Sequence, residues 1–272
     1  MSLPPAGADR TCLVTGASSG IGEQIARELA RRHFGLTLVA RREELLRALA
    51  AELESAHGIR AEVVAADLTD ATAREDLAGA IAARGLTVDV LVNNAGFSTT
   101  GAVYRSDHHR EVAMLRTNVE AVADLCSLFL PGMVERGRGA VLNVASTAAF
   151  QPLPGQAGYG ATKAFVLSYT QAIRAELKGT GVTATVLCPG PVDTGFGEAA
   201  GFAHEEAEAA LPKFMWVSPA DVAKAAVAGL DAGKGVVIPG AANRVGARFA
   251  WLAPRSVLLP VLAKQHPALK NR

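Results

Sequence analysis

The sequence predicts an α/β protein with a doubly wound parallel sheet of about seven strands, helices on both faces, and a single domain. Two observations support this fold class. Short apolar runs rich in β-branched residues alternate with longer amphipathic runs along the 272 residues, and strands that alternate with helices pair in parallel through right-handed crossovers. The short runs are also continuously apolar, which is typical of strands covered on both faces. Because half of the residues are hydrophobic and 19% are charged, the chain can fill one large core.

The seven apolar runs are the expected strands. In chain order they are Thr11–Thr15, Leu36–Ala40, Ala61–Ala65, Val88–Val92, Ala140–Ala145, Thr183–Leu187 and Gly235–Pro239. The amphipathic runs predict helices over 21–33, 42–56, 71–84, 108–135, 159–178 and 219–231. Nothing in the sequence reads as a linker or a repeat, so we expect one domain over 1–272 with its core at about 9–240. In such sheets ligands bind beyond the carboxyl ends of the strands, so the residues that follow each strand are the functional candidates.

Local signals support several helix boundaries. Asp70 can cap the helix that follows the third strand. Ser218-Pro219 combines an N-cap residue with a proline at the first helical position, where no N–H is needed. The segment 108–135 is long for a globular helix, and we expect Pro131 to bend it or to begin its last turn.

Composition argues against several classes of protein. With 27 Lys and Arg against 26 Asp and Glu, the net charge of +1 argues against a dedicated nucleic-acid binder. The three cysteines lie far apart without a CxxC pair and the six histidines lack metal-binding spacing, so no metal site is predicted. We interpret the cysteines as buried thiols in a reducing cytosol. The first ten residues lack the apolar segment of a signal peptide, which also favours a cytoplasmic location.

A glycine-rich turn, Thr15-Gly16-Ala17-Ser18-Ser19-Gly20-Ile21-Gly22, follows the first strand. Glycines let backbone N–H groups approach a diphosphate, and the N-terminus of the next helix supplies the positive end of its dipole. The spacing is GxxxGxG rather than the general GxGxxG, and a tight turn without a ligand is the alternative. The residues expected to contact a dinucleotide are Gly16, Ser18, Ser19, Gly20, Ile21 and Gly22.

The second strand ends in Ala40-Arg41-Arg42, where NAD sites usually carry a carboxylate for the ribose 2′-hydroxyl. A carboxylate would repel a 2′-phosphate, whereas a guanidinium binds it through charge-assisted hydrogen bonds. The sequence therefore predicts NADP(H), with Arg41 a stronger candidate than Arg42. The alternative is that both arginines lie at a solvated helix start.

Weaker candidates for cofactor contacts follow the third and fourth strands, namely Asp67, Leu68, Asn94, Ala95 and Gly96. After the third strand comes Asp67-Leu68, in which Asp67 could accept a hydrogen bond from an adenine amino group or could instead cap the helix over 71–84. After the fourth comes Asn93-Asn94-Ala95-Gly96. Asparagine side chains such as those of Asn93 and Asn94 can tie loop backbones together, and Gly96 permits the close approach of a flat ligand.

The strongest chemical signal is Tyr159-Gly160-Ala161-Thr162-Lys163, because the i, i+4 spacing places the phenol and the ammonium on one helix face. A phenol with a pKa of about 10 is a poor acid–base catalyst at neutral pH. A nearby ammonium favours the phenolate and moves that pKa toward the operating pH. The alternative is an ordinary pair on a helix surface.

Two further polar residues could join this pair. Ser146 lies just past the fifth strand, where its hydroxyl would face the same mouth of the sheet. Asn118 lies inside the long helix before that strand, a mildly unfavourable position for asparagine. The alternatives are a loop serine and a hydrogen-bonding residue of the core.

Together these motifs resemble the short-chain dehydrogenase/reductase family, which implies a Rossmann-type sheet. The similarity runs from about residue 9 to 240. Its six motifs are TGxxxGxG at Thr15–Gly22, NNAG at 93–96, the asparagine Asn118, the serine Ser146, YxxxK at Tyr159–Lys163, and Pro189-Gly190. The resemblance also implies that Val192 and Thr194, just after Pro189 and Gly190, contact the nicotinamide.

The resemblance implies a mechanism. NADPH would deliver hydride to a carbonyl carbon while Tyr159 protonates the developing alkoxide. Ser146 would hydrogen-bond that oxygen. Lys163 would lower the pKa of Tyr159 and bind the nicotinamide ribose, and Asn118 would hold a water that connects Lys163 to solvent.

The family's substrate specificity comes largely from the loop after the sixth strand, here about 195–217, and from the C-terminal segment. The apolar residues of this loop predict a lid for a hydrophobic substrate, or else residues that only pack on the domain. They are Phe196, Phe202, Leu211, Phe214, Met215 and Trp216, with Glu198, Glu205, Glu206 and Glu208 on an expected wet face. Across the pocket, Phe150, Gln151, Pro152 and Leu153 are further candidates for the lining.

The C-terminal extension, 243–272, departs from the compact family pattern. Residues 243–252 read as a basic amphipathic helix, and a second apolar piece follows at Val257–Ala263. Three interpretations remain open: packing on the domain or on a neighbouring subunit, lining the substrate pocket, and peripheral contact with a membrane surface.

We therefore expect an NADP(H)-dependent oxidoreductase that interconverts a carbonyl and a secondary alcohol on a mid-sized, rather apolar substrate. The resemblance implies a homodimer or homotetramer that pairs the helices at 108–135 and 159–178. The alternatives are an NAD-dependent alcohol dehydrogenase and a catalytically silent nucleotide-binding regulator.

Overall fold

The seven predicted strands form one parallel sheet in the order β3-β2-β1-β4-β5-β6-β7. The computed structural model describes residues 3–196, 212–265 and 269. The strands are β1 (Arg10–Thr15), β2 (Leu36–Ala40), β3 (Ala61–Ala65), β4 (Thr87–Asn93), β5 (Gly139–Val144), β6 (Val182–Leu187) and β7 (Val236–Val237). Only β7 is clearly shorter than expected, because its ladder pairs just two residues with β6. The order reverses between β1 and β4, which is where doubly wound sheets bind their ligands.

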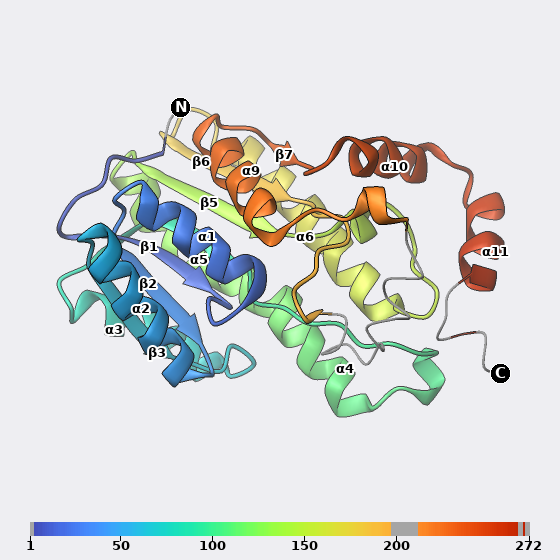
Figure 1. Ribbon diagram of the computed structural model, residues 1–272, viewed down its shortest axis with the longest axis horizontal. Coiled ribbons are helices and arrows are strands. Elements are labelled where there is room, and N and C mark those ends of the chain that lie inside the picture. The colour runs from blue at the N-terminus through green and yellow to red at the C-terminus, as the bar shows by residue number, and fades with distance from the viewer. Residues whose placement is uncertain (1–2, 197–211, 266–268, 270–272) are drawn as a thin grey trace.

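Helices cover both faces of the sheet (Figure 1). One buried cluster joins the sheet to α1 (Gly20–Arg31), α2 (Glu43–His57) and α9 (Pro219–Asp231). A second cluster, on the opposite face, joins it to α3 (Ala71–Ala82), α5 (Ala121–Glu135) and α6 (Ala157–Glu176). The three cysteines are buried free thiols, as the sequence predicted.

The predicted helix caps are confirmed. The Asp70 side chain accepts a hydrogen bond from the backbone N–H of Thr72 at 2.9 Å. The Ser218 hydroxyl accepts one from Asp221 at 3.1 Å, with Pro219 at the first helical position. Each cap satisfies one of the N–H groups that a helix start leaves without an intrahelical partner.

The long helix predicted over 108–135 is three pieces rather than one. Helix α4 (His108–Leu115) runs into a π-helical segment at Arg116–Glu120, and α5 continues from there. Pro131 lies inside α5, four residues before the last residue of that helix, Glu135. The irregularity lies instead at the π segment, a feature that is common at functional sites because it redirects side chains within a helix.

The π segment is tied to the loop after β3 by a buried arginine. Arg74 on α3 is 2% exposed and forms ion pairs with Glu120 and Asp124. Its guanidinium also donates to the backbone carbonyl of Leu68 at 2.8 Å. Since Leu68 was predicted to contact the cofactor, this one side chain links that loop to the helix that carries Asn118.

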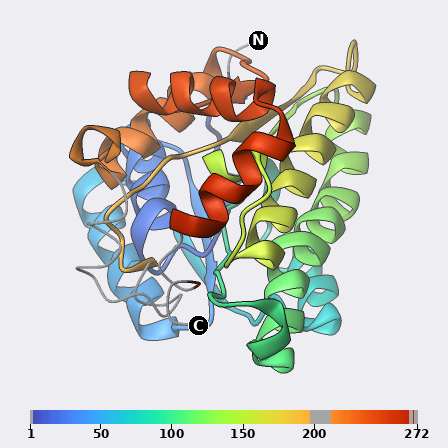
Figure 2. The same ribbon diagram turned by 90° about the vertical axis from the view of Figure 1, so that its right-hand side faces the viewer.

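The C-terminal extension folds as two helices at the carboxyl end of the sheet, α10 (Ala241–Leu252) and α11 (Arg255–Gln265). Figure 2, which faces this end of the molecule, shows α11 lying across it with α10 above. Helix α10 packs against the short 3-10 turn Thr147–Phe150 that follows β5. The extension is therefore part of the domain around the mouth of the sheet.

Candidate active site

A single cavity of about 1030 Å³ opens at the carboxyl ends of the strands. It brings together nearly all of the residues predicted for the cofactor and the chemistry. Among its lining residues are Gly16, Ser18, Ser19, Gly20, Ile21, Arg41, Arg42, Asp67, Leu68, Asn94, Ala95, Gly96, Ser146, Tyr159, Lys163, Pro189, Gly190, Val192 and Thr194. The two predicted residues that do not line it, Gly22 and Asn118, lie immediately behind its wall.

The glycine turn requires glycine at defined positions. Gly16 and Gly20 have φ of 64° and 60°, in the left-handed region that side chains disfavour. Gly22 has an ordinary φ, but a Cβ there would lie 2.3 Å from the Asn94 amide nitrogen and 2.4 Å from the Gly16 carbonyl oxygen. The glycine at this third position therefore permits close packing of α1 on the loop after β4.

Thr15 and Asn94 hold that packing together. The Thr15 hydroxyl accepts hydrogen bonds from the backbone N–H groups of Asn94 and Ala95, both at 3.0 Å, and donates to Val92. The Asn94 amide donates back to the carbonyl of Thr15 at 3.0 Å. The prediction that an asparagine here would tie loop backbones together is confirmed for Asn94. Thr15 was not predicted as a site residue, although a hydroxyl at a strand end beside a glycine turn was a usable signal.

The N-terminus of α1 has no side-chain cap, because the hydroxyls next to it are engaged elsewhere. Ser19 occupies the N-cap position without capping the helix. The Arg42 guanidinium instead donates to Ser18 at 3.0 Å and to Ser19 at 2.9 Å. A helix N-terminus beside a guanidinium and two hydroxyls is suited to an anion. Arg41 lines the same cavity, but it is Arg42 that reaches the glycine turn.

The loop after β3 forms the far wall of this part of the cavity. Asp67 does not cap α3, because that role belongs to Asp70; its carboxylate accepts instead from the backbone and hydroxyl of Thr69. Leu68 is 6% exposed and packs in the core beneath the cavity. Both residues line the cavity, as predicted for residues near an adenine.

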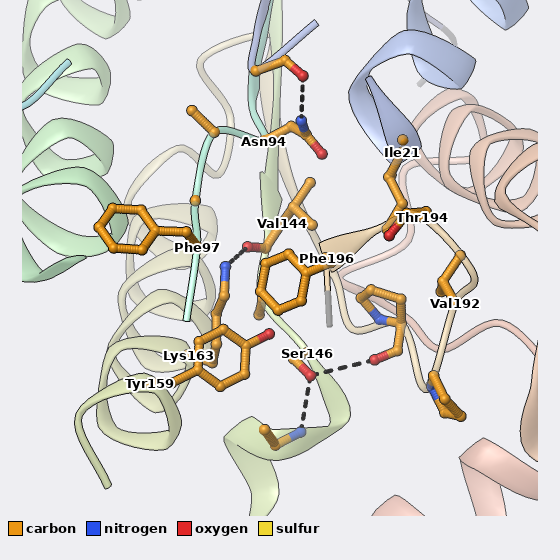
Figure 3. Close-up of a pocket in the computed structure, with 18 of the residues that line it drawn as sticks. Ile21, Asn94, Phe97, Val144, Ser146, Tyr159, Lys163, Val192, Thr194 and Phe196 are labelled. Carbon is orange, nitrogen blue, oxygen red and sulfur yellow. Dashed lines mark hydrogen bonds between the residues drawn. The ribbon is translucent and has the colours of Figure 1, made fainter. Parts of the chain in front are cut away.

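Tyr159 and Ser146 point into the other half of the cavity (Figure 3). Burial raises the pKa of Tyr159 to about 12, and hydrogen bonding with Ser146 offsets part of that rise. The Ser146 hydroxyl also accepts from the backbone N–H of Ala148 at 3.1 Å and lies 3.5 Å from the Pro189 carbonyl oxygen. Ser146 is thereby held in one orientation as the N-cap of the turn Thr147–Phe150.

Lys163 is nearly buried, at 5% exposed, and its ammonium donates to the Val144 carbonyl at the end of β5 at 2.9 Å. Burial lowers the pKa of Lys163 to about 8. Its Nζ lies 5.7 Å from the centre of the Tyr159 ring. The net direction of the Tyr159 shift is thus opposite to the one predicted for the pair, since burial of the phenol outweighs other influences.

Asn118 lies on the π segment and is 1% exposed. Its amide exchanges two hydrogen bonds with the backbone of Phe97, at 2.9 and 3.1 Å, and donates to the Thr162 hydroxyl at 3.1 Å. A Cβ on Gly96 would lie 2.9 Å from the Asn118 Oδ1 and 3.5 Å from the Lys163 Nζ. The absence of a side chain at Gly96 therefore lets Asn118 and Lys163 approach the loop.

The described part of the predicted lid forms an apolar wall. Phe196 lies 5.7 Å from Tyr159 between ring centres, and Met215 and Trp216 line the cavity. Phe214 is 75% exposed and is absent from the lining. On the opposite side Gln151 and Leu153 line the cavity, whereas Phe150 and Pro152 do not. The remaining lid predictions lie outside the described residues; they are Phe202, Leu211, Glu198, Glu205, Glu206 and Glu208.

The C-terminal extension completes the wall. Gly246, Ala247, Ala250 and Leu262 line the cavity, so two of the three interpretations, packing on the domain and lining the pocket, both hold. Asn243, which the sequence analysis missed, is 1% exposed and donates to the carbonyls of Met215 and Pro239. It joins α10 to the lid. Asn243 lies in the first turn of α10, so it carried no signal comparable to that of Asn94 directly after a strand.

Comparison with known proteins agrees with this geometry. The family model of the short chain dehydrogenases matches residues 10–203. An uncharacterised oxidoreductase of Myxococcus xanthus is 41% identical over 181 residues, which cover 66% of this chain and 71% of that protein. An NADP-dependent 3-hydroxy acid dehydrogenase of Salmonella typhi is 37% identical over 181 residues, again 66% and 71% of the two chains.

A solved structure gives the same result for the fold. A short-chain dehydrogenase from Sphingobium yanoikuyae in complex with NADPH has a TM-score of 0.79 and 33% identity, and the match covers 92% of this chain and 95% of that one. Since the family model alone spans more than half of the sequence, this protein belongs to the short-chain dehydrogenase/reductase family of oxidoreductases.

Proposed function

We propose that the protein is an NADP(H)-dependent oxidoreductase that interconverts a carbonyl and a secondary alcohol on a mid-sized, rather apolar molecule. The observation that carries the proposal is that Tyr159, Ser146 and Lys163 share one cavity with the glycine turn. At about 1030 Å³ this cavity slightly exceeds the usual range of roughly 300–1,000 Å³ for a pocket that holds one ligand. Such a volume suits a dinucleotide together with a substrate.

The residues present fit the cofactor along the length of the cavity. The glycine turn and the uncapped N-terminus of α1 suit the diphosphate, and Val192 and Thr194 suit the nicotinamide end. When bound, the nicotinamide would supply or accept the hydride. The two predicted cationic contacts, Arg41 and Arg42, support a preference for NADP(H), as does the lack of a carboxylate at positions 40–42, where β2 ends.

Tyr159 is the proposed acid in the direction of reduction. With a pKa raised to about 12 the phenol holds its proton throughout the neutral range. The rise makes it a weaker acid, but a developing alkoxide is a stronger base than a phenolate and can take the proton. Ser146, held by its own hydrogen bonds, is oriented to donate to the same oxygen. The Lys163 ammonium, 5.7 Å from the ring centre, stabilises the phenolate that remains.

Asn118 is a positioning residue in this proposal. Both atoms of its amide are already paired, with Phe97 and Thr162, so it fixes the loop after β4 against the helix that carries Tyr159 and Lys163. A water held between Asn118 and Lys163 would supply the route for replacing the proton.

The lining of the substrate half supports an apolar molecule. Its walls carry Phe97, Leu153, Phe196, Met215, Trp216 and Leu262. Apolar and aromatic walls with a few fixed polar groups are typical of sites that exclude strongly hydrated ligands. The polar lining also includes Gln151 and Gln156, and within it Ser146 and Tyr159 would mark the position of the reacting oxygen.

Tyr159→Phe removes the proposed acid and keeps the ring. We expect kcat to fall by about 10²–10⁴-fold because proton transfer to the substrate is lost. The Kd for NADPH should change little. The measurement is NADPH oxidation with a panel of aromatic and aliphatic ketones. Tyr169→Phe is the matched control, since Tyr169 lies on the same helix but stacks on Phe165 outside the cavity. Turnover that survives in Tyr159→Phe would contradict the mechanism.

Arg42→Ala and Arg41→Ala test the cofactor preference. Loss of one charge-assisted contact to a 2′-phosphate weakens binding by a factor of roughly ten to a hundred. The Kd for NADPH should therefore rise by that factor, while the Kd for NADH changes little. Fluorescence titration of both nucleotides provides the measurement. Arg47→Ala, which removes an exposed ion pair with Glu43, is the control. Equal effects on both nucleotides, or tighter binding of NADH by the unaltered protein, would refute the NADP(H) preference.

Lys163→Met tests the cost of burying the ammonium. A pKa lowered from 10.5 to about 8 means that below pH 8 the charged form is disfavoured in the folded state by up to about 3 kcal/mol. Between pH 8 and 10.5 Lys163 is protonated in the unfolded chain but mostly neutral in the folded protein. The contribution of Lys163 to the free energy of unfolding of the wild type therefore rises with pH across that window. The variant should therefore be more stable at pH 7, with the gain shrinking toward pH 10.5, yet inactive.

Urea denaturation at several pH values measures this difference. Lys224→Met on the exposed side of α9 serves as the control and should show no such pH dependence. If the gain in stability of Lys163→Met over the wild type were smaller at pH 7 than at pH 10, the assignment of a disfavoured buried charge would be contradicted.

A further inference from the structure

The outward faces of α10 and α11 expose an unusual amount of apolar surface. We call the residues concerned the outer tail face. They are Val245 (71% exposed), Phe249 (69%), Trp251 (67%), Leu252 (68%), Val257 (64%) and Val261 (47%). Of the thirteen large hydrophobic side chains exposed in the described part of the chain, six belong to this face. Exposed apolar side chains gathered on two neighbouring helices often mark an interaction site.

Helix geometry separates this face from the one that lines the cavity. Val245, Phe249 and Leu252 are spaced i, i+4, i+7 and share one side of α10. Asn243, Ala247 and Ala250 are buried on the other side. The packing of the domain therefore satisfies only one side of the helix. Figures 1 and 2 show both helices at the end of the molecule, where solvent can reach them.

The charge along the segment that carries this face has one sign. Residues 232–272 contain seven of the chain's 27 Lys and Arg and none of its 26 Asp and Glu. The first 231 residues have the opposite excess, with 20 basic and 26 acidic residues. Arg244 and Arg248 are exposed one position before Val245 and Phe249, so a basic stripe runs beside the apolar one.

We propose that the outer tail face docks on an anionic lipid surface. Apolar side chains that include Trp and Phe, flanked by arginines on an amphipathic helix, are the features of a helix that lies in a membrane interface. Arginines near an anionic surface add electrostatic attraction. The described residues contain no helix long and apolar enough to cross a membrane, so the contact would be peripheral.

Charge also decides against a second copy of the chain as the occupant. A two-fold interface would bring the same patch of both subunits together, and here that patch would set like charges from two basic segments against each other, which is unfavourable. An anionic lipid surface complements the same segment. Because Ala247 and Ala250 on the opposite side of α10 line the cavity, docking would leave α10 between the cavity and the lipid.

The experiment uses the full-length protein with vesicles of phosphatidylcholine, with and without phosphatidylglycerol. We expect sedimentation with the anionic vesicles, weakened by salt because exposed charges are screened, and little with phosphatidylcholine alone. The chain has two tryptophans, so in a Trp216→Phe background the emission of Trp251 reports insertion directly. It should shift to the blue on binding and be quenched by brominated lipid.

Variants of the outer tail face separate its two components. Phe249→Ser with Leu252→Ser should lower the partition coefficient at least tenfold, since apolar burial is lost. Arg244→Gln with Arg248→Gln should lower it about fivefold for each arginine, and only on anionic vesicles. These side chains do not line the cavity, whereas deleting 243–272 would remove part of its wall. Leu45→Ser on α2, which removes an exposed leucine from another part of the surface, should leave binding unchanged.

Several results would overturn the proposal. They are failure of the full-length protein to sediment with anionic vesicles, equal binding to both kinds of vesicle, and variants that bind as tightly as the parent. A fourth is a wild-type oligomer that Phe249→Ser with Leu252→Ser dissociates in solution while no vesicle binding is seen; this would assign the face to a second copy. None of these readouts depends on turnover, so they stand or fall separately from the proposed function.

Discussion

The hydrogen bond between the Lys163 ammonium and the Val144 carbonyl is the contact on which the rest of the site depends. It fixes a helix that carries Tyr159 against the end of a central strand, and it places a cation under the phenol ring. Burying that cation is unfavourable, and the lowered pKa of Lys163 is the sign of it. A core built for stability alone would carry an apolar side chain here, which is why the buried lysine is read as functional.

The polar neighbours of this contact are themselves hydrogen-bonded or given room. Asn118 on the π segment pairs with the backbone of Phe97, and Gly96 leaves room for both side chains to approach. At the other end of the cavity Thr15 and Asn94 bind the glycine turn to the loop after β4. The two halves of the cavity are therefore supported by the same loop, so a ligand in one half is held in a fixed relation to the chemistry in the other.

Sequence reasoning predicted most of the fold, since strands such as Leu36–Ala40 are continuous apolar runs whose parallel pairing follows from alternation with helices. It also predicted which residues meet at the strand ends, because topology alone brings them to one edge.

Sequence reasoning missed the π segment, because one additional residue in a helical turn leaves no periodic signature in 116–120. It misjudged the pKa of Tyr159, because that value depends on burial by residues distant in sequence, among them Phe196. Arg42 rather than Arg41 contacts the glycine turn, and this depends on side-chain rotamers that the sequence does not specify.

The most direct measurement of the central claim is a crystal structure of the protein with NADP⁺ bound. We expect the diphosphate at the glycine turn, the nicotinamide ring in the half of the cavity that holds Tyr159 and Ser146, and ribose hydroxyls within hydrogen-bonding distance of Lys163. A nucleotide bound elsewhere, or a nicotinamide directed away from Tyr159 with Lys163 contacting only Val144, would contradict the claim.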